Sequence, residues 1–211
     1  GKSTLVKILS GVVRPDEGEI TLDGQTLNFR QPADAITAGV GMIFQELSLI
    51  PDLRVSQNIF LGIEEPDRLG GTSAKALRAR AYDLFDRMGI DVADPDRTVN
   101  ELSLSQRQMV EIAKVVARNP KVLILDEATS SLDSIAETFV QNTIKVLRNE
   151  KKTVIVIAHR LATISLADRI IVLDKGKVVQ EGTFSELAVA EGHFRTMWSH
   201  QNLEPTQVTR N

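Results

Sequence analysis

Two short runs of aliphatic residues, separated by a stretch with helical periodicity, constrain the fold of this chain more than any other feature. The runs occupy residues 122–125 and 154–157. Continuous apolar runs of this length are typical of strands that are buried on both faces of a parallel sheet. The helical periodicity between them is carried by Ala136, Val140, Ile144 and Leu147. A strand, a crossover helix and a second strand predict a parallel sheet in an α/β fold.

Residues before the first run predict an antiparallel arm, a short strand and a helical region. Alternating residues flank Asp23-Gly24, which indicates a hairpin, and residues 40–44 form a short apolar strand. Two apolar stripes with helical spacing follow. They comprise Leu77, Ala81, Leu84, Phe85 and Met88, and then Met109, Ile112, Ala113 and Val116. Such stripes predict helix faces that pack in a core.

Residues after the second run predict another hairpin, around Asp174-Lys175-Gly176, and a last helix. Thr183 and Glu186 have the spacing of a capping box at the start of that helix. No internal repeat or long low-complexity stretch divides the chain. Its length predicts one domain over residues 1–211, with residues 202–211 as a flexible tail.

Composition excludes several classes of function. The net charge is -3, which gives no basic surface for nucleic acid. The 211 residues contain no Cys, which excludes disulfides, Cys-ligated zinc and a Cys nucleophile within them, and which fits a reducing cytosol. No apolar run reaches the roughly 18 to 20 residues that a membrane-spanning helix needs.

The chain begins with Gly1-Lys2-Ser3-Thr4, the second half of a phosphate-binding loop of the form G-x-x-x-x-G-K-[ST]. In such a loop, backbone N–H groups surround the phosphates of a nucleotide, the Lys offsets their charge and the hydroxyl holds Mg²⁺. We therefore expect a nucleotide-binding domain that begins inside its own active site. The chain as written is then expected to bind ATP poorly and not to hydrolyse it.

A helix is predicted directly behind this motif. Leu5, Ile8 and Leu9 lie at helical spacing. Gly11 follows as a stop signal, so Ser3 is expected in the first turn of the helix.

Asp126 and Glu127 follow the first aliphatic run directly. Parallel sheets bind their ligands at the carboxyl ends of their strands. ATP hydrolysis needs one carboxylate near Mg²⁺ and one that polarises the attacking water, and Asp126 suits the first role and Glu127 the second. The alternative is structural: both carboxylates cap the next helix or meet solvent.

Six motifs in this order resemble the nucleotide-binding domain of ABC transporters over essentially the whole chain. They are residues 1–4 (GKST), Gln45 within IFQE, residues 102–106 (LSLSQ), residues 123–127 (LILDE), residues 131–133 (SLD) and His159. The resemblance implies a P-loop NTPase with a RecA-like core, an antiparallel β arm and a helical subdomain. It further implies that two such domains form a dimer around two ATP molecules.

The resemblance also implies roles for single residues. Gln45 would contact Mg²⁺ and the attacking water, and would relay the nucleotide state to a membrane partner. His159 would contact the γ-phosphate and position the water. Asp133 would belong to a loop at the dimer interface. Each residue has a plain alternative: Gln45 as a polar strand end, His159 as a structural group at a strand end, and Asp133 as the N-cap of the following helix.

Ser103, Ser105 and Gln106 occupy the family's signature segment, which caps the γ-phosphate held by the opposite subunit. This segment departs from the usual LSGGQ, because Leu104 and Ser105 replace both glycines. Ser103 and Gln106 keep the family's residue types. Ser105 adds a side chain where close approach of the backbone would matter.

Two branches of the family are represented in the chain. The first part, including QMVEIAK at residues 108–114, resembles ATPases of carbohydrate importers. The part from DEATSSLD, which starts at Asp126, resembles exporters, although residues 94–100 lack the exporter segment that precedes the signature. The resemblance implies membrane-spanning permease subunits and a solute-binding protein as partners, and a peripheral location at the cytoplasmic face of the cell membrane.

Three alternatives to a carbohydrate-import ATPase stay open. One is an exporter domain separated from its membrane part, and another is a fragment that folds without turnover. The third is a soluble ABC ATPase of DNA repair or translation. No coiled-coil insertion, basic surface or Cys-rich zinc module supports the third.

Overall fold

The computed structural model describes residues 2–44, 47–65, 73–89, 93–126, 134–157 and 161–202. The chain divides into two compact units. The larger comprises Val6–Ile157, and the smaller comprises Gly1–Leu5 together with Ala158–Asn211. The described residues leave out five predicted site residues, which are Gly1, Gln45, Glu127, Asp133 and His159. They also leave out residues 203–211 of the expected tail.

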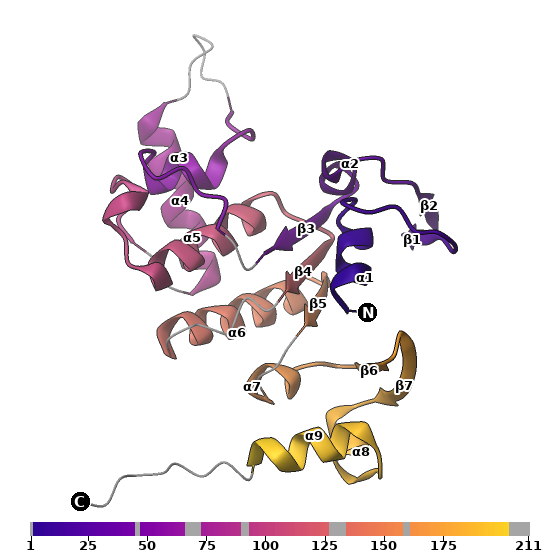
Figure 1. Cartoon of the computed structure of the whole chain (residues 1–211). Helices are drawn as coiled ribbons and strands as arrows, with labels where there is room; N and C mark the ends of the chain where they lie inside the picture. Colours follow the sequence, from indigo (N-terminus) through magenta and orange to yellow (C-terminus); the bar gives the residue numbers. More distant parts are fainter. Residues whose placement is uncertain are drawn as a thin grey trace, which may run out of the picture. The chain divides into compact units, whose positions relative to one another are not determined.

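Helix α1 (Lys2–Leu9) contributes residues to both units. The larger unit continues with an arm, a sheet and a set of helices (Figure 1). Its elements are β1 (Ile20–Leu22), β2 (Gln25–Leu27), α2 (Pro32–Thr37), β3 (Val40–Ile43), α3 (Val55–Phe60), α4 (Ala74–Met88), the 3₁₀ helix η1 (Val99–Glu101), α5 (Leu104–Ala117), β4 (Val122–Asp126), α6 (Ser134–Asn149) and β5 (Thr153–Ile157).

The predicted parallel sheet is confirmed. Strands β3, β4 and β5 pair in that order, and both pairings are parallel. Strand β4 is buried on both faces as expected, with Leu123, Ile124 and Leu125 all at most 2% exposed. The same expectation was wrong for β5, where Ile155 is 36% exposed. Among the described residues β5 pairs with β4 alone, so it forms an edge of this sheet.

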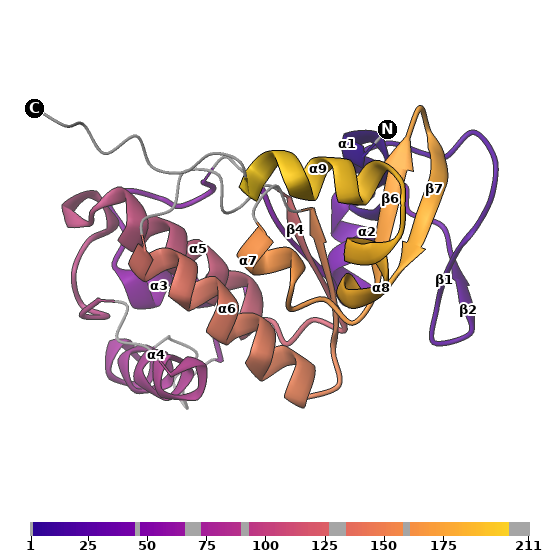
Figure 2. The ribbon, with the colours of Figure 1, turned by 90° about the horizontal axis from the view of Figure 1, so that it is seen from below.

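The two faces of the sheet carry separate cores. Leu123 and Leu125 point into the larger core, which α3, α4, α5 and α6 cover, whereas Ile124 points into the smaller one beside Val6 of α1 and Ala35 of α2. This alternation follows from the two-residue period of a strand. Figure 1 shows α3 to α6 on one side of the strands and α2 on the other. Figure 2 shows α5 and α6 lying side by side.

The helix stripes expected on α4, α5 and α6 are confirmed, since every apolar residue named for them is buried. On α1 the prediction was partly wrong. The helix ends before Gly11, as expected, but Val6 is its buried residue and Leu5 is 47% exposed. Helices α2 and α3 were not predicted, because six residues are too few to show a helical period.

Both predicted hairpins are confirmed. In the arm, β1 and β2 are joined through Asp23 and Gly24, with φ of 52° and 76°. In the smaller unit, β6 (Ile170–Asp174) and β7 (Lys177–Gly182) are joined through Lys175 and Gly176, with φ of 46° and 80°. Positive φ at both central residues is the geometry of tight two-residue hairpins, which explains the glycines.

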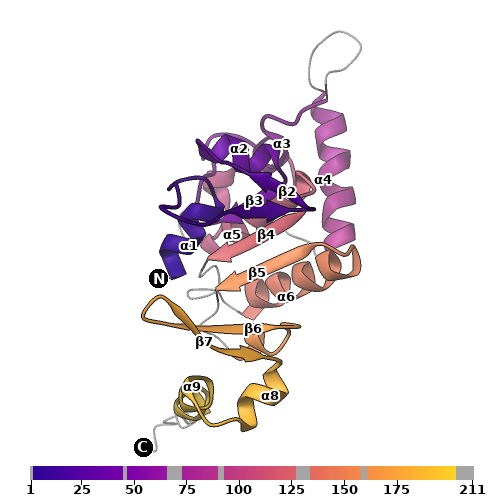
Figure 3. The same ribbon diagram turned by 90° about the vertical axis from the view of Figure 1, so that its right-hand side faces the viewer.

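The smaller unit also contains α7 (Leu161–Ile164), α8 (Phe184–Val189) and α9 (His193–Asn202). Helices α8 and α9 pack against each other and against β7 (Figure 3). Phe184 joins them through edge-to-face contacts with Phe194 and Trp198. The sequence predicted one last helix, at the capping box, whereas the chain forms a second one after Gly192.

The predicted capping box of α8 is confirmed. The Thr183 backbone N–H and hydroxyl donate to the Glu186 carboxylate at 2.8 and 2.9 Å, and both contacts lower the pKa of Glu186. A folded-state pKa below the unfolded value means that this contact stabilises the unit above the unfolded pKa. The stabilisation is lost as the pH falls through the lowered pKa.

Candidate functional site

The carboxyl ends of the three parallel strands lie at one edge of the sheet. The register aligns Ile43 of β3 with Leu125 of β4, and Leu125 with Val156 of β5. In the sequence, Gln45 and Glu127 follow two positions after their aligned residues, and His159 follows three positions after Val156. The described strands therefore lead the chain to all three predicted catalytic residues from the same edge.

Asp126 is the described acidic residue at this edge. It ends β4, pairs with Ile157 of β5 and is half-buried. The buried residues before it fix the strand in both cores, so the backbone at Asp126 has a defined position. This placement is the one expected for a group that acts on a bound nucleotide.

Lys2, Ser3 and Thr4 form the first turn of α1, as the sequence predicts, and all three are exposed. They belong to the smaller unit, whereas Asp126 belongs to the larger one. The predicted helix behind the GKST motif is thus confirmed.

Ser103 and Gln106 form the N-terminal cap of α5. The Ser103 hydroxyl accepts the Gln106 backbone N–H at 3.2 Å, and the Gln106 side-chain oxygen accepts the Ser103 backbone N–H at 3.1 Å. This reciprocal capping box satisfies two of the N–H groups that a helix start leaves open. In this cap the Ser103 hydroxyl oxygen and the Gln106 side-chain oxygen both act as acceptors. Sequence reasoning assigned Gln106 to nucleotide binding and missed its capping role.

The two residues in place of the family glycines differ in exposure. Leu104 is 58% exposed at the first position of α5, and Ser105 is half-buried beside it. An exposed Leu at this helix start places an apolar side chain on the surface that the signature segment presents.

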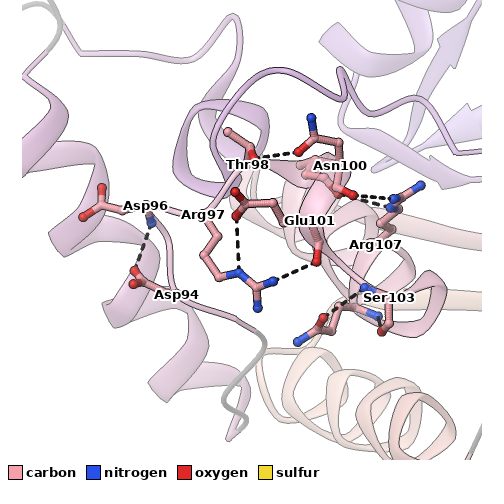
Figure 4. A network of polar contacts seen from close by, with 10 residues as sticks. Asp94, Asp96, Arg97, Thr98, Asn100, Glu101, Ser103 and Arg107 are labelled. Atoms are coloured by element: carbon pink, nitrogen blue, oxygen red, sulfur yellow. Dashed lines mark hydrogen bonds and ion pairs between the residues drawn. The ribbon is translucent and has the colours of Figure 1, made fainter.

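Two arginines fix the turn that leads into α5 (Figure 4). Arg107 donates to the carbonyl oxygens of Val99 and Asn100 at 3.1 and 2.9 Å. Arg97 donates to the carbonyl oxygen of Glu101 at 2.7 Å. Arginine offers several donors in a rigid plane, so two side chains suffice to hold η1 against the start of α5. Sequence reasoning missed both, because carbonyl acceptors leave no motif in a sequence.

Asn58 holds the segment that leads into α3. Its fully buried amide accepts the Ile50 backbone N–H at 2.8 Å and donates to the carbonyl oxygens of Ile50, Leu53 and Arg54 at 3.0 to 3.3 Å. Satisfied buried amides of this kind fix a loop in one conformation. In the sequence, Asn58 directly precedes the apolar residues 59–61. This position could have indicated a buried amide, which would need hydrogen-bond partners.

Two further properties bear on function. Within the described ranges no cluster of three or more His, Cys, Asp or Glu side chains is arranged to hold a metal ion by itself. In the same part of the chain, no helix combines the length and the apolar character needed to cross a bilayer.

Comparison with known proteins identifies the family. The family model for ABC transporters matches residues 1–130. The chain belongs to this family. The antiparallel arm, the parallel sheet and the helices α3 to α5 are then parts of an ABC ATPase domain, and the fold expected from the sequence is confirmed.

Two curated members of the family that resemble the chain are named as import ATP-binding proteins. The ribose import ATP-binding protein RbsA 1 of Mesorhizobium japonicum is 44% identical over 95% of this chain and 39% of its own length. The arabinose import ATP-binding protein AraG 2 of Burkholderia ambifaria is 41% identical over 89% of this chain and 36% of its own length. The chain thus spans less than two fifths of the curated relatives that it matches.

Two solved structures of ABC ATPases have the same fold as this chain. A bacterial Atm1-family ABC exporter with ATP bound has a TM-score of 0.75 and 30% identity, over 98% of this chain and 36% of that chain. An ATP-binding cassette in a dimeric post-hydrolysis state, bound to ADP and Pi, has a TM-score of 0.70 and 31% identity, over 87% of this chain and 80% of that chain.

Proposed function

We propose that this chain is the ATP-binding and ATP-hydrolysing part of an ABC importer for a carbohydrate. The observation that carries the proposal is the shared edge of β3, β4 and β5, from which the chain continues to Gln45, Glu127 and His159. The 44% identity to a ribose import ATP-binding protein supports the carbohydrate class.

The first turn of α1 would bind the phosphates. Gly1 and Thr4 would contribute backbone N–H groups, and Lys2 would offset the negative charge of the phosphates. His159 would contact the γ-phosphate. The exposure of Lys2, Ser3 and Thr4 leaves their polar groups accessible to such a ligand.

The donor set fits Mg²⁺. The Ser3 hydroxyl, the Gln45 amide oxygen and the Asp126 carboxylate are hard oxygen donors, and Mg²⁺ binds through few protein ligands while it keeps several waters. A bound Mg²⁺ would neutralise charge that develops on the phosphates. Ser3 and Gln45 would contact it directly, Asp126 would orient its water shell, and Glu127 would accept the proton of the attacking water.

The signature segment and Asp133 would act across a dimer of two such domains. The Ser103 hydroxyl proton and the backbone at Ser105 would serve as donors to the ATP held by the second domain. The dimeric relative with ADP and Pi bound supports this arrangement. Gln106 would act mainly through the cap that shapes the start of α5.

The membrane-spanning subunits of the importer, and a solute-binding protein that delivers the sugar, would be the further partners. A peripheral position at the cytoplasmic face of the membrane follows from such partners. An exporter is the second candidate, because the ATP-bound exporter matches 98% of this chain.

Reconstitution of the full natural chain would test the proposal. The protein would be combined with membrane-spanning permease subunits of a carbohydrate importer, in vesicles that contain sugar on one side. We expect Mg-ATP hydrolysis that the transported pentose or hexose stimulates, together with uptake toward the side that holds the ATPase. Movement in the opposite direction would establish the exporter. Absence of ATP hydrolysis would refute both.

A double substitution, Leu104→Gly with Ser105→Gly, tests whether the signature segment of this chain closes less well than LSGGQ. We expect it to strengthen ATP-driven dimerisation of a hydrolysis-deficient form, because backbone can approach the second nucleotide more closely without these side chains. Glycine in the first turn of α5 should also lower the free energy of unfolding by about 1 kcal/mol.

Light scattering with ATP would measure the dimer, and nucleotide affinity of the monomer serves as the control. An unchanged dimerisation constant would show that Leu104 and Ser105 already allow full closure.

A further inference from the structure

Ser48 is bound to α5 through all of its polar groups. Its hydroxyl donates to Glu111 Oε1 at 2.6 Å, and its backbone N–H donates to Glu111 Oε2 at 3.3 Å. Lys114 Nζ donates to the Ser48 carbonyl oxygen at 2.9 Å and to the Ser48 hydroxyl oxygen at 3.0 Å. One residue of a connecting segment is thus held by two side chains that lie one turn apart on the same helix.

The Glu111 carboxylate is unusual for its burial. The residue is only 5% exposed, although Glu is seldom fully buried unless it is paired. Both carboxylate oxygens accept a hydrogen bond from Ser48, which offsets the cost of removing the charge from water. A residue that served only to fill space at this position would be apolar, as Met109, Ile112 and Ala113 around it are.

The position of Ser48 in the chain gives this contact a consequence for the active site. Ser48 lies three residues after Gln45, and Ser103 caps the start of the same helix that holds Ser48. A movement of α5 would therefore act on Ser48 through two charged side chains. Glu111 and Lys114 join the helix that Ser103 caps to the segment that begins at residue 47.

We propose that Glu111 is a positioning residue for ATP hydrolysis, which fixes the segment after Gln45 to α5 by holding Ser48. This inference rests on the function proposed above and adds a residue to it. Glu111 touches no nucleotide, so its loss should alter the rate of hydrolysis and leave ATP binding in place. Small displacements of a catalytic group are sufficient to cost a large part of the rate.

The test uses the full natural chain and steady-state kinetics with Mg-ATP. We expect Glu111→Ala to lower kcat roughly 10-fold while KM stays within about two-fold. Glu111→Gln keeps one acceptor for the Ser48 hydroxyl and should fall between Glu111→Ala and the wild type. Ser48→Ala should lower kcat as well, and adding it to Glu111→Ala should cause little further loss, because the two residues act through one contact.

Two further measurements distinguish the proposed positioning role of Glu111 from a merely structural role. Hydrogen exchange should rise in residues 47–53 of the variants. Glu150→Gln is the matched control, since it breaks the bidentate 2.8 Å ion pair between Arg87 of α4 and Glu150, which follows α6, and should leave kcat unchanged. If Glu111→Ala does not fold, Ser48→Ala decides, because it removes the 2.6 Å hydrogen bond to Glu111 without leaving a large space in the core.

The outcomes distinguish the two proposals. A wild-type protein that hydrolyses ATP, with variants that keep its kcat, would overturn the role of Glu111 and leave the proposed function intact. Equal loss of kcat in Glu150→Gln would also overturn it, because the effect would then reflect general stability. A wild-type protein without Mg-ATPase activity would overturn both.

Discussion

Glu127→Gln in the full natural chain is expected to lower the rate of ATP hydrolysis by about 10² to 10⁴ while ATP binding stays nearly intact. The substitution keeps the shape of the side chain but removes the carboxylate that would accept a proton from the attacking water. The supporting observation is sequence position: Glu127 follows Asp126, which ends the buried strand β4 at the edge where parallel sheets generally bind ligands.

Single-turnover hydrolysis and equilibrium ATP binding would be measured on the same preparation. Glu17→Gln is the matched control, because Glu17 is an exposed carboxylate in the connection between α1 and β1. Its rate should equal that of the wild type. If Glu127→Gln turned over ATP within a few-fold of the wild type, Glu127 would not be the general base, and a structural role at the strand end would be the better interpretation.

The sequence predicted the central strand of the sheet, β4, because the apolar pattern of its residues agrees with their burial. Residues 122–125 are apolar without interruption and β4 is buried on both faces, so pattern and environment agree. The same kind of pattern at residues 154–157 wrongly predicted a strand that is buried on both faces. A strand's own residues do not reveal whether a second neighbour pairs with it, and Ile155 is accordingly exposed in β5.

The motifs gave a set of candidate site residues, and these stay a prediction, whereas the motifs missed the residues that hold the neighbouring segments in place. Ser103 and Gln106 were recognised from their position in the signature segment, yet their capping box is a local helix-start effect that any protein could use. Asn58, Arg97, Arg107 and Glu111 act through backbone groups or through a residue far away in the sequence. Such contacts follow from tertiary packing, which a linear motif does not encode.

Asp126→Asn is expected to shift the Mg²⁺ concentration that supports half-maximal hydrolysis upward by roughly 10- to 100-fold, the usual effect of losing a group that orients a metal's ligands. The amide keeps the size of the carboxylate and one oxygen, but it lacks the negative charge that would hold the water shell of the ion. Because Asp126 ends β4 behind three buried residues, the change should leave the fold intact. A Mg²⁺ titration of hydrolysis at saturating ATP would measure the shift, with Asp86→Asn on the exposed face of α4 as the control. A Mg²⁺ midpoint equal to that of the wild type, at any hydrolysis rate, would show that Asp126 does not contribute to Mg²⁺ binding. Loss of rate with an unshifted midpoint would instead indicate that Asp126 acts by positioning the end of β4, and so the residue that follows it.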